Sequence, residues 1–157
     1  MRQDGGVPAT ENTFHCFKPN TGNTRIELDA NGAGHDTARF LLRTNNAQLV
    51  NVLGDVIYAQ GWKIICWQWD HPNKTAKLIM NGNVFSGTNL LMDDFDFQIP
   101  TSTYVIGTRQ DEFGNLITPL TGKMGEFFYY SDVKSNAVIN QLGNYLGNKY
   151  GLIWTNI

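Results

Sequence analysis

The chain has 157 residues, of which 41% are hydrophobic and 17% are charged, and its formal net charge is −2. That length fits one domain with a substantial core, and 12 basic against 14 acidic side chains give no electrostatic surface for nucleic acid or an anionic membrane. No apolar run approaches the roughly 20 residues that span a bilayer, and the first residues show no secretory signal. We expect a flexible lead-in or partner-contacting arm over residues 1–12, followed by a single domain over residues 13–157.

The N-terminal third predicts short strands separated by polar turns. Residues 13–18, TFHCFK, alternate in character and stop at a proline, and residues 24–29, TRIELD, alternate apolar with charged side chains. The second of these strands is expected to bury its apolar face and to leave Glu27 and Asp29 in solvent. Residues 38–52 then predict a hairpin around the polar turn TNNA.

The most informative stretch is residues 61–82, GWKIICWQWDHPNKTAKLIMNG. Residues 62–70 alternate, and the face that carries Trp67 and Trp69 is expected to pack into the core. The residues DHPNK have the chemistry of a turn, and the second strand, 76–80, ends at Asn-Gly, which readily forms a tight turn. An aromatic strand of this kind needs a second layer to cover it, so the hairpin predicts one wall of a two-sheet core.

The C-terminal half adds fewer strands and one helix. Residues 104–107 predict a short strand, and residues 110–121 predict a long loop. Residues 123–130, KMGEFFYY, are apolar on both faces, as a strand buried on both sides would be. Ser135 then suits the N-cap of an amphipathic helix, and Gly151 suits the residue just beyond its end. The pattern predicts an all-β, two-sheet antiparallel jelly-roll sandwich with one short C-terminal helix.

The order of these motifs resembles that of the concanavalin A-like (laminin-G-like) superfamily of lectins and glucanases. The resemblance covers residues 13–152 and consists of an early strand ending in Lys-Pro, the central hairpin, a short strand, a G-x-apolar-x-E strand and a helix ending in Lys-Tyr-Gly: residues 13–19, 61–82, 104–107, 122–130 and 145–151. It implies a jelly-roll domain. Such domains usually carry a further strand or two before the Lys-Pro strand, so the lead-in or a partner chain is expected to supply one.

Enzymatic activity is not expected. Glucanases of this superfamily present a Glu-x-Asp-x-x-Glu pattern on one strand, and the four glutamates of this chain do not form it: Glu11, Glu27, Glu112 and Glu126. Asp94 and Asp96 would share a face if they lay on a strand, but an acidic surface loop is the favoured interpretation. Three scattered histidines suggest no catalytic constellation: His15, His35 and His71.

No cofactor is expected, with Ca²⁺ kept as the alternative because many relatives hold it at the loop rim through hard oxygen ligands. The candidate metal ligands are Asp29, Asn31 and Asp36, and a second acidic cluster lies near residue 112. The same residue types are equally common in turns, which is the favoured interpretation. Cys16 and Cys66 lack metal-like spacing and are expected to be free thiols.

Carbohydrate binding is the sharper hypothesis, because sugars stack on aromatic rings and bond to planar polar side chains. The candidate ligand-binding residues lie in two predicted loops: Asp70, His71 and Asn73, and Asp111, Glu112, Phe113 and Asn115. Phe113 is expected to be exposed, and Trp154 is equally suited to a contact with a neighbouring chain.

The sequence therefore predicts a non-enzymatic recognition or adhesion module that binds a cell-surface glycan. We expect it on the surface of a virion, such as a bacteriophage, or otherwise outside the cell. The alternative is a purely structural capsid decoration or fibre protein that contacts neighbouring virion chains or a second copy of itself, and a glycan-active enzyme comes third. Neither nucleic-acid binding nor membrane insertion is expected.

Overall fold

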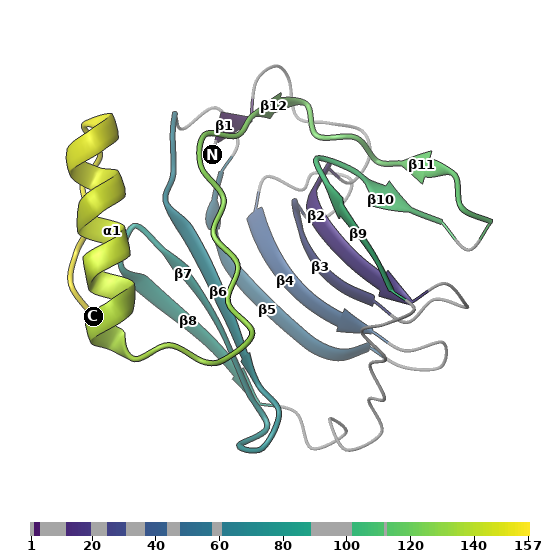
Figure 1. Ribbon diagram of the computed structural model, residues 1–157, viewed down its shortest axis with the longest axis horizontal. Coiled ribbons are helices and arrows are strands. Elements are labelled where there is room, and N and C mark those ends of the chain that lie inside the picture. The colour runs from purple at the N-terminus through teal and green to yellow at the C-terminus, as the bar shows by residue number, and fades with distance from the viewer. Residues whose placement is uncertain are drawn as a thin grey trace.

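The computed structural model describes residues 2–3, 12–19, 25–30, 37–43, 48–57, 61–88, 102–111 and 113–157. These residues form antiparallel β-sheets and one C-terminal helix, so the predicted all-β class with a late helix is confirmed (Figure 1). The elements are β1 (Arg2–Gln3), β2 (Asn12–Pro19), β3 (Arg25–Ala30), β4 (Thr37–Arg43), β5 (Gln48–Val56), β6 (Ile65–Asp70), β7 (Thr75–Met80), β8 (Asn83–Thr88), β9 (Ser102–Ile106), β10 (Arg109–Gln110), β11 (Leu116–Ile117), β12 (Gly122–Lys123) and α1 (Asn136–Tyr150).

The larger sheet has five antiparallel strands in the order β5-β4-β3-β2-β9. The predicted strands at 13–18 and 24–29 and the predicted hairpin at 38–52 are therefore confirmed. Alternate residues of β2, β3 and β4 point to one face, where Phe14, Leu28, Phe40 and Leu42 are buried. Part of the predicted lead-in also takes part in the fold, since β1 pairs with β12 and Asn12 begins β2.

The opposite face of β3 corrects the prediction of a strand with one face in solvent. Glu27 and Asp29 are both fully buried. Asp29 accepts two hydrogen bonds from the Arg39 guanidinium, one of them 2.8 Å long from Nε to Oδ1. Glu27 accepts a 2.9 Å hydrogen bond from the Thr13 hydroxyl and lies 3.7 Å from Arg109 Nη1. The prediction was wrong because alternation of charged residues shows which face they share and not whether cations cover that face.

The smaller sheet has three strands in the order β6-β7-β8 and contains the predicted central hairpin. Its tight turn uses positive φ at Asn81 and Gly82, as the Asn-Gly pair predicted. Trp67 stacks on Phe40 of the larger sheet with ring centroids 4.9 Å apart, and Trp69 also packs against the buried cluster. The aromatic face of this hairpin therefore covers the larger sheet, as expected.

Residues 124–134, called the facing segment below, differ from the prediction. The sequence predicted a strand over 123–130 buried on both sides, but strand pairing ends with β12 at Lys123. The four aromatic side chains that follow are between 37% and 54% exposed: Phe127, Phe128, Tyr129 and Tyr130. The facing segment runs alongside β6 toward α1 (Figure 1). Side-chain pattern alone could not show that a backbone ladder does not form here.

The C-terminal helix agrees closely with the prediction. Ser135 is its N-cap and accepts a hydrogen bond from Val138 N, and Gly151 ends it in the left-handed conformation with φ 66°. The chain then turns back so that Trp154 lies against Gly143. Trp154 is therefore occupied within its own chain. Among the described residues, no helix is long and apolar enough to cross a membrane.

Candidate functional site

The first predicted binding loop is the β6–β7 turn, and its polar side chains serve the turn itself. Asp70 Oδ1 accepts a 3.2 Å hydrogen bond from the backbone N–H of Asn73, and Oδ2 accepts a 2.8 Å bond from the Asn73 amide. His71 is exposed, and its ring lies 5.5 Å from that of Trp69. This is the arrangement of a side-chain-stabilised turn.

The second predicted loop contains a small hairpin that the sequence did not indicate, β10 paired with β11. Asp111 organises its tip, because Oδ1 accepts backbone hydrogen bonds from Phe113 and Asn115 at 2.9 and 2.8 Å, and Oδ2 accepts a 3.0 Å bond from the Asn115 amide. Phe113 is 81% exposed, as expected. Glu112 lies outside the described residues.

The two predicted loops do not come together. Figure 1 places the β6–β7 turn at the lower edge of the molecule and the β10–β11 hairpin at the right-hand edge, with the larger sheet between them. Because this view looks down the shortest axis, a wide separation in the picture is a separation in space. The six predicted ligand-binding residues that the structure describes therefore lie in two separate turns and share no groove.

The predicted metal ligands are also not assembled in the described structure. Asp29 is buried against Arg39, and the other two candidates, Asn31 and Asp36, lie outside the described residues, as do Asp94 and Asp96. Over the described part of the chain, no three His, Cys, Asp or Glu side chains converge in a way that would hold a metal ion. Asp29 and Glu27 do share one face of β3, which the order Glu-Leu-Asp could have indicated.

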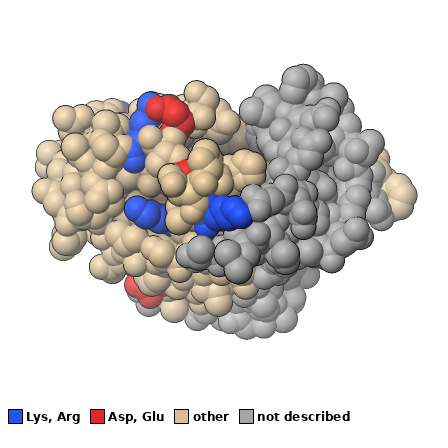
Figure 2. Space-filling view, turned by 90° about the horizontal axis from the view of Figure 1, so that it is seen from below, with Lys and Arg blue, Asp and Glu red and all other residues tan. Residues whose placement is uncertain are grey.

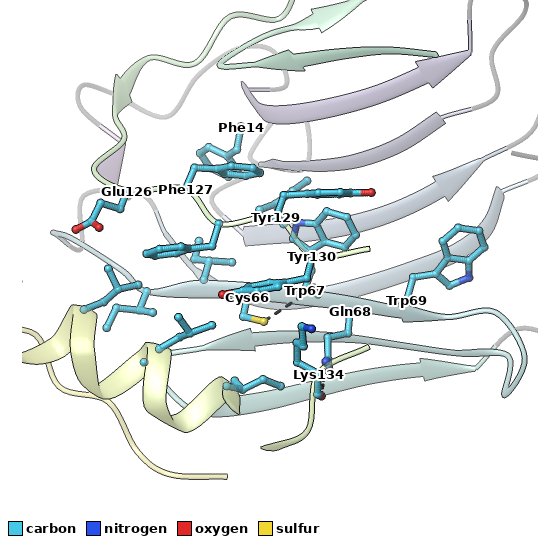
Figure 3. Close-up of a pocket in the computed structure, with 18 of the residues that line it drawn as sticks. Phe14, Cys66, Trp67, Gln68, Trp69, Glu126, Phe127, Tyr129, Tyr130 and Lys134 are labelled. Atoms are coloured by element: carbon cyan, nitrogen blue, oxygen red, sulfur yellow. Dashed lines mark hydrogen bonds between the residues drawn. The ribbon is translucent and has the colours of Figure 1, made fainter. Parts of the chain in front are cut away.

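A different site stands out beside β6, the edge strand of the smaller sheet. A cavity of about 600 Å³, called the β6 cleft below, lies between β6 and the facing segment. Side chains of α1, including Ile139 and Leu142, close its inner end. Figure 3 shows side chains from β6, the facing segment and the helix converging on this space.

Aromatic rings line the β6 cleft from both sides. Trp67 and Trp69 belong to β6. From the other side, Tyr104 of β9 forms a cluster with Phe127 and Tyr129, at ring-centroid distances of 5.8 and 6.1 Å. Burial of Tyr104 raises the pKa of its hydroxyl, so that the group stays protonated and neutral at neutral pH. The part of the cleft around Tyr104 is therefore aromatic and uncharged.

Polar contacts hold the C-terminal end of the facing segment in place. The Gln68 amide donates a 2.8 Å hydrogen bond to the Lys134 carbonyl oxygen, which links β6 directly to this segment. The Lys134 ammonium lies 2.7 Å from Asp132 Oδ1 and 4.7 Å from the centroid of the Tyr130 ring.

A second group of contacts holds the segment to the last turn of α1. Glu126 Oε1 accepts bonds of 2.8 Å from both Lys149 Nζ and the Tyr150 hydroxyl, and Oε2 accepts a 3.2 Å bond from the Tyr145 hydroxyl. Hydrogen bonds from Lys149, and then from Tyr150, lower the pKa of the Glu126 carboxyl, so it is ionised at neutral pH. Glu126 thus acts as an anchor between the cleft wall and the helix.

The cysteine in the cleft lining is unsuited to nucleophilic catalysis. Cys66 is a free thiol, as predicted, and burial raises its pKa to about 11. Only the thiolate is strongly nucleophilic, so the group is inert at neutral pH. The side chain of Cys16 lies outside the described part of the structure.

Sequence reasoning missed this cleft because it assigned residues 123–130 to a buried strand. One indication was available, the run of four aromatic residues after Glu126. A single strand cannot bury four adjacent rings, so some of them had to line a surface. Glu126 and Lys149 are 23 positions apart, and nothing in their spacing indicated contact. No protein-family model, curated protein or solved structure matches this chain.

Proposed function

We propose that this chain is a non-enzymatic recognition module that binds carbohydrate in the β6 cleft, on a jelly-roll sandwich of the concanavalin A-like type. The observation that carries the proposal is the aromatic lining of one cleft, to which β6 contributes Trp67 and Trp69 and to which Tyr104 and Tyr129 contribute from other elements. Sugar rings present apolar C–H faces that stack on such side chains, while their hydroxyls bond to a few polar groups at the rim.

We propose binding without catalysis because of the pKa and the hydrogen-bond partners of the Glu126 carboxyl in the cleft. A general acid for glycoside hydrolysis needs a raised pKa and a partner carboxyl at a defined distance. Glu126 instead has a lowered pKa and accepts hydrogen bonds from Lys149 and from two tyrosine hydroxyls. Its contacts support an anchoring role in the wall of a binding site.

The test is a glycan array followed by calorimetry with the strongest ligand, using matched aromatic variants. Tyr129→Ala removes a half-exposed ring from the cleft, and Phe113→Ala removes an exposed ring from the distant β10–β11 hairpin. We expect Tyr129→Ala to weaken binding about tenfold or more, equivalent to about 1.4 kcal/mol, and Phe113→Ala to leave it unchanged. If Phe113→Ala weakened binding and Tyr129→Ala did not, the binding site would lie at the β10–β11 hairpin and not in the cleft. Absence of binding to any glycan would overturn the proposal.

A structural protein that decorates a capsid or forms part of a fibre is the second candidate, and one observation favours it. Phe128, Tyr129, Tyr130 and Tyr145 are each more than 40% exposed, and several exposed aromatic side chains are typical of surfaces that contact other proteins. If this candidate is correct, the purified chain should self-associate in light scattering. Phe128→Ser should then abolish that association, and the glycan array should be blank.

A further inference from the structure

We propose that the β6 cleft accepts an extended, uncharged strand from another protein, which extends the smaller sheet between β6 and the facing segment. This inference goes beyond the proposed carbohydrate function, because the occupant is a polypeptide backbone and not a sugar. It follows from the position of the cleft along a strand edge, from the direction of the two backbones beside it and from the chemistry of its lining.

The cleft follows the edge of β6 and not one of its faces. All six residues of β6 line it. Successive side chains of a strand point to opposite faces, so a cavity that touches all of them lies beside the strand, where its two faces meet. Every residue of the facing segment also lines the cleft, and this segment runs alongside β6 (Figure 1). The cleft is therefore bounded by two lengths of backbone.

The edge of β6 that borders the cleft is the outer edge of the smaller sheet. In the described part of the chain, β6 forms a ladder with β7 alone, and the facing segment belongs to no ladder. The link between them is made by a side chain, the Gln68 amide that donates to the Lys134 carbonyl oxygen at 2.8 Å. An edge of this kind is a template on which a further strand can add through main-chain hydrogen bonds.

The two backbones run in the same direction. The facing segment begins near Trp62, since a Cβ at Gly125 would lie 3.7 Å from that ring. It ends at Lys134, beside Gln68. Between these contacts the segment advances nine residues while the chain beside it advances six, so the two backbones do not keep register with each other. A strand that ran the opposite way between them could pair antiparallel with both.

The rest of the lining specifies the side chains of such a strand. The larger sheet contributes the core residues Phe14, Ile26 and Leu28, and α1 contributes Leu142 and Leu146. Figure 3 shows Phe14 on the side of the larger sheet and the helix on the far side of β6. A strand in contact with both groups would bury apolar side chains on both of its faces, as strands that are covered on both sides do.

The charges at the cleft favour an uncharged strand. Lys149 pairs with Glu126 at 2.8 Å, Lys134 pairs with Asp132 at 2.7 Å, and Asp70 accepts hydrogen bonds within its own turn. A charged segment would compete with these contacts, whereas an uncharged one would leave them intact. Figure 2 shows basic and acidic side chains interspersed over the described part of one face, so no surface of one sign draws a charged partner there.

A different protein, and not a second copy of this chain, is the expected donor. Among the described residues, every strand already belongs to a ladder and would have to leave it. The facing segment is outside any ladder, but a second copy of it would bring the Glu126 carboxylate into an apolar lining and would break its contact with Lys149. Burying a carboxylate without its partner is unfavourable.

The first experiment selects peptides on the intact chain. Two displayed libraries of nine-residue peptides contain uncharged, mostly β-branched residues, and the control library differs only in two central prolines, which remove backbone donors. We expect enrichment from the first library alone. Enrichment of the proline library to the same extent, or of neither library, would overturn the proposal.

The second experiment tests whether the backbone is recognised. The strongest synthetic peptide is compared by calorimetry with an analogue whose alternate backbone nitrogens are methylated. The analogue keeps every side chain but cannot donate to one of the two edges, so we expect it to bind about tenfold or more weakly. Hydrogen exchange should show added protection in both β6 and the facing segment. Equal affinity of the analogue, or protection confined to other elements, would contradict strand addition.

A pair of variants locates the peptide. Leu146→Glu places a carboxylate in the apolar lining and should weaken peptide binding about tenfold or more. Gln141→Glu adds the same charge at an exposed position of α1 outside the lining and should leave binding unchanged. Thermal melts check that both variants fold, and if Leu146→Glu does not, the methylated analogue and the exchange data decide.

The outcomes separate this inference from the carbohydrate proposal. If glycans bind but neither peptide library is enriched, strand addition is overturned and the carbohydrate function stands. If the peptide binds as expected but the glycan array is blank, the carbohydrate function alone is overturned. A dimer in analytical ultracentrifugation that the peptide dissociates would mean that a second copy fills the cleft, and the proposal of a different protein would be wrong.

Discussion

The five-stranded sheet and the facing segment are both rich in aromatic and charged residues, but they are held in place by different interactions. Strands β2 to β5 are joined by antiparallel ladders, and their charges are buried in pairs such as Asp29 with Arg39. The facing segment is joined by side chains alone, to β6 through Gln68, to α1 through Glu126 and to β9 through the rings around Tyr104. The sheet therefore serves as the scaffold, and the segment is a wall held without a backbone ladder.

Two glutamates, Glu27 in the five-stranded sheet and Glu126 in the facing segment, differ in their burial and in their partners. Glu27 is fully buried, accepts a hydrogen bond from Thr13 and lies near Arg109. Glu126 is bound by more donors but stands in solvent-accessible surroundings. A buried charge is costly to leave without its partner, whereas an exposed one is readily solvated. The number of contacts that a carboxylate makes therefore does not measure how much it stabilises the fold.

The largest expected effect is in the core of the scaffold. Phe40→Ala removes a fully buried ring that stacks on Trp67, and we expect it to lower the free energy of unfolding by about 4 kcal/mol. The matched change Phe128→Ala in the facing segment should cost less than about 1 kcal/mol, because that ring is 42% exposed. Urea denaturation of both variants measures the difference, and similar losses would contradict the division into scaffold and wall.

Breaking the buried ion pair should have the next largest effect. Arg39→Met leaves the Asp29 carboxylate buried without its guanidinium, and we expect a loss of about 3 kcal/mol in urea denaturation. The double variant Arg39→Met with Asp29→Asn should recover part of that loss, because the uncompensated charge is then gone. Lys149→Met breaks the more exposed ion pair with Glu126 and serves as the comparison. If Arg39→Met lowered the free energy of unfolding no more than Lys149→Met does, the face of β3 that carries Asp29 would be open to water.

The packing of the C-terminal tail on α1 should be sensitive to a single methyl group. A Cβ at Gly143 would lie 2.2 Å from the Trp154 ring, so Gly143→Ala should destabilise the chain by about 1–3 kcal/mol despite the higher helix propensity of alanine. Gln141→Ala, at an exposed position of the same helix, is the control and should be nearly neutral. Thermal unfolding followed by circular dichroism compares the two.

Acid should loosen the facing segment before the scaffold. The folded pKa of Glu126 is lowered by Lys149 and Tyr150, so its stabilising effect is present above the unfolded value of about 4.3 and is lost as pH falls through the folded pKa. We expect the protection factors of amides in residues 124–134 to fall below about pH 4 while those of β3 and β4 persist. Glu126→Gln should remove this pH dependence, and hydrogen exchange read by mass spectrometry checks both.

The smallest expected effect is at the tip of the β10–β11 hairpin. Phe113 is 81% exposed, so Phe113→Ser should change the free energy of unfolding by no more than about 0.5 kcal/mol. Asp111→Ala removes the acceptor of three hydrogen bonds at the same tip and should cost more. Equal effects in urea denaturation would mean that Phe113 packs against neighbouring residues of its own chain.

The candidate site could be anticipated only in part. The alternation of residues 62–70 predicted that Trp67 and Trp69 would pack inward, and they do so while also lining the cleft. The facing segment, which forms the opposite wall of the cleft, could not be anticipated, because residues 123–130, KMGEFFYY, have the composition of a buried strand. The polar loops were chosen for residue types that bind sugars and calcium, but the same types stabilise turns. Asp70 and Asp111 are each engaged by backbone and amide groups of their own turn.

By itself, the sequence determined the features that depend on near neighbours along the chain. Strand positions follow from alternation, the β7–β8 turn from Asn81-Gly82, and the helix from Ser135 and Gly151 at its two ends. Only the tertiary structure decided that Arg39 buries Asp29, that Glu126 contacts Lys149 and that the facing segment stays apart from β6. These outcomes depend on which distant groups come within a few ångströms of one another, and short-range periodicity carries no information about that distance.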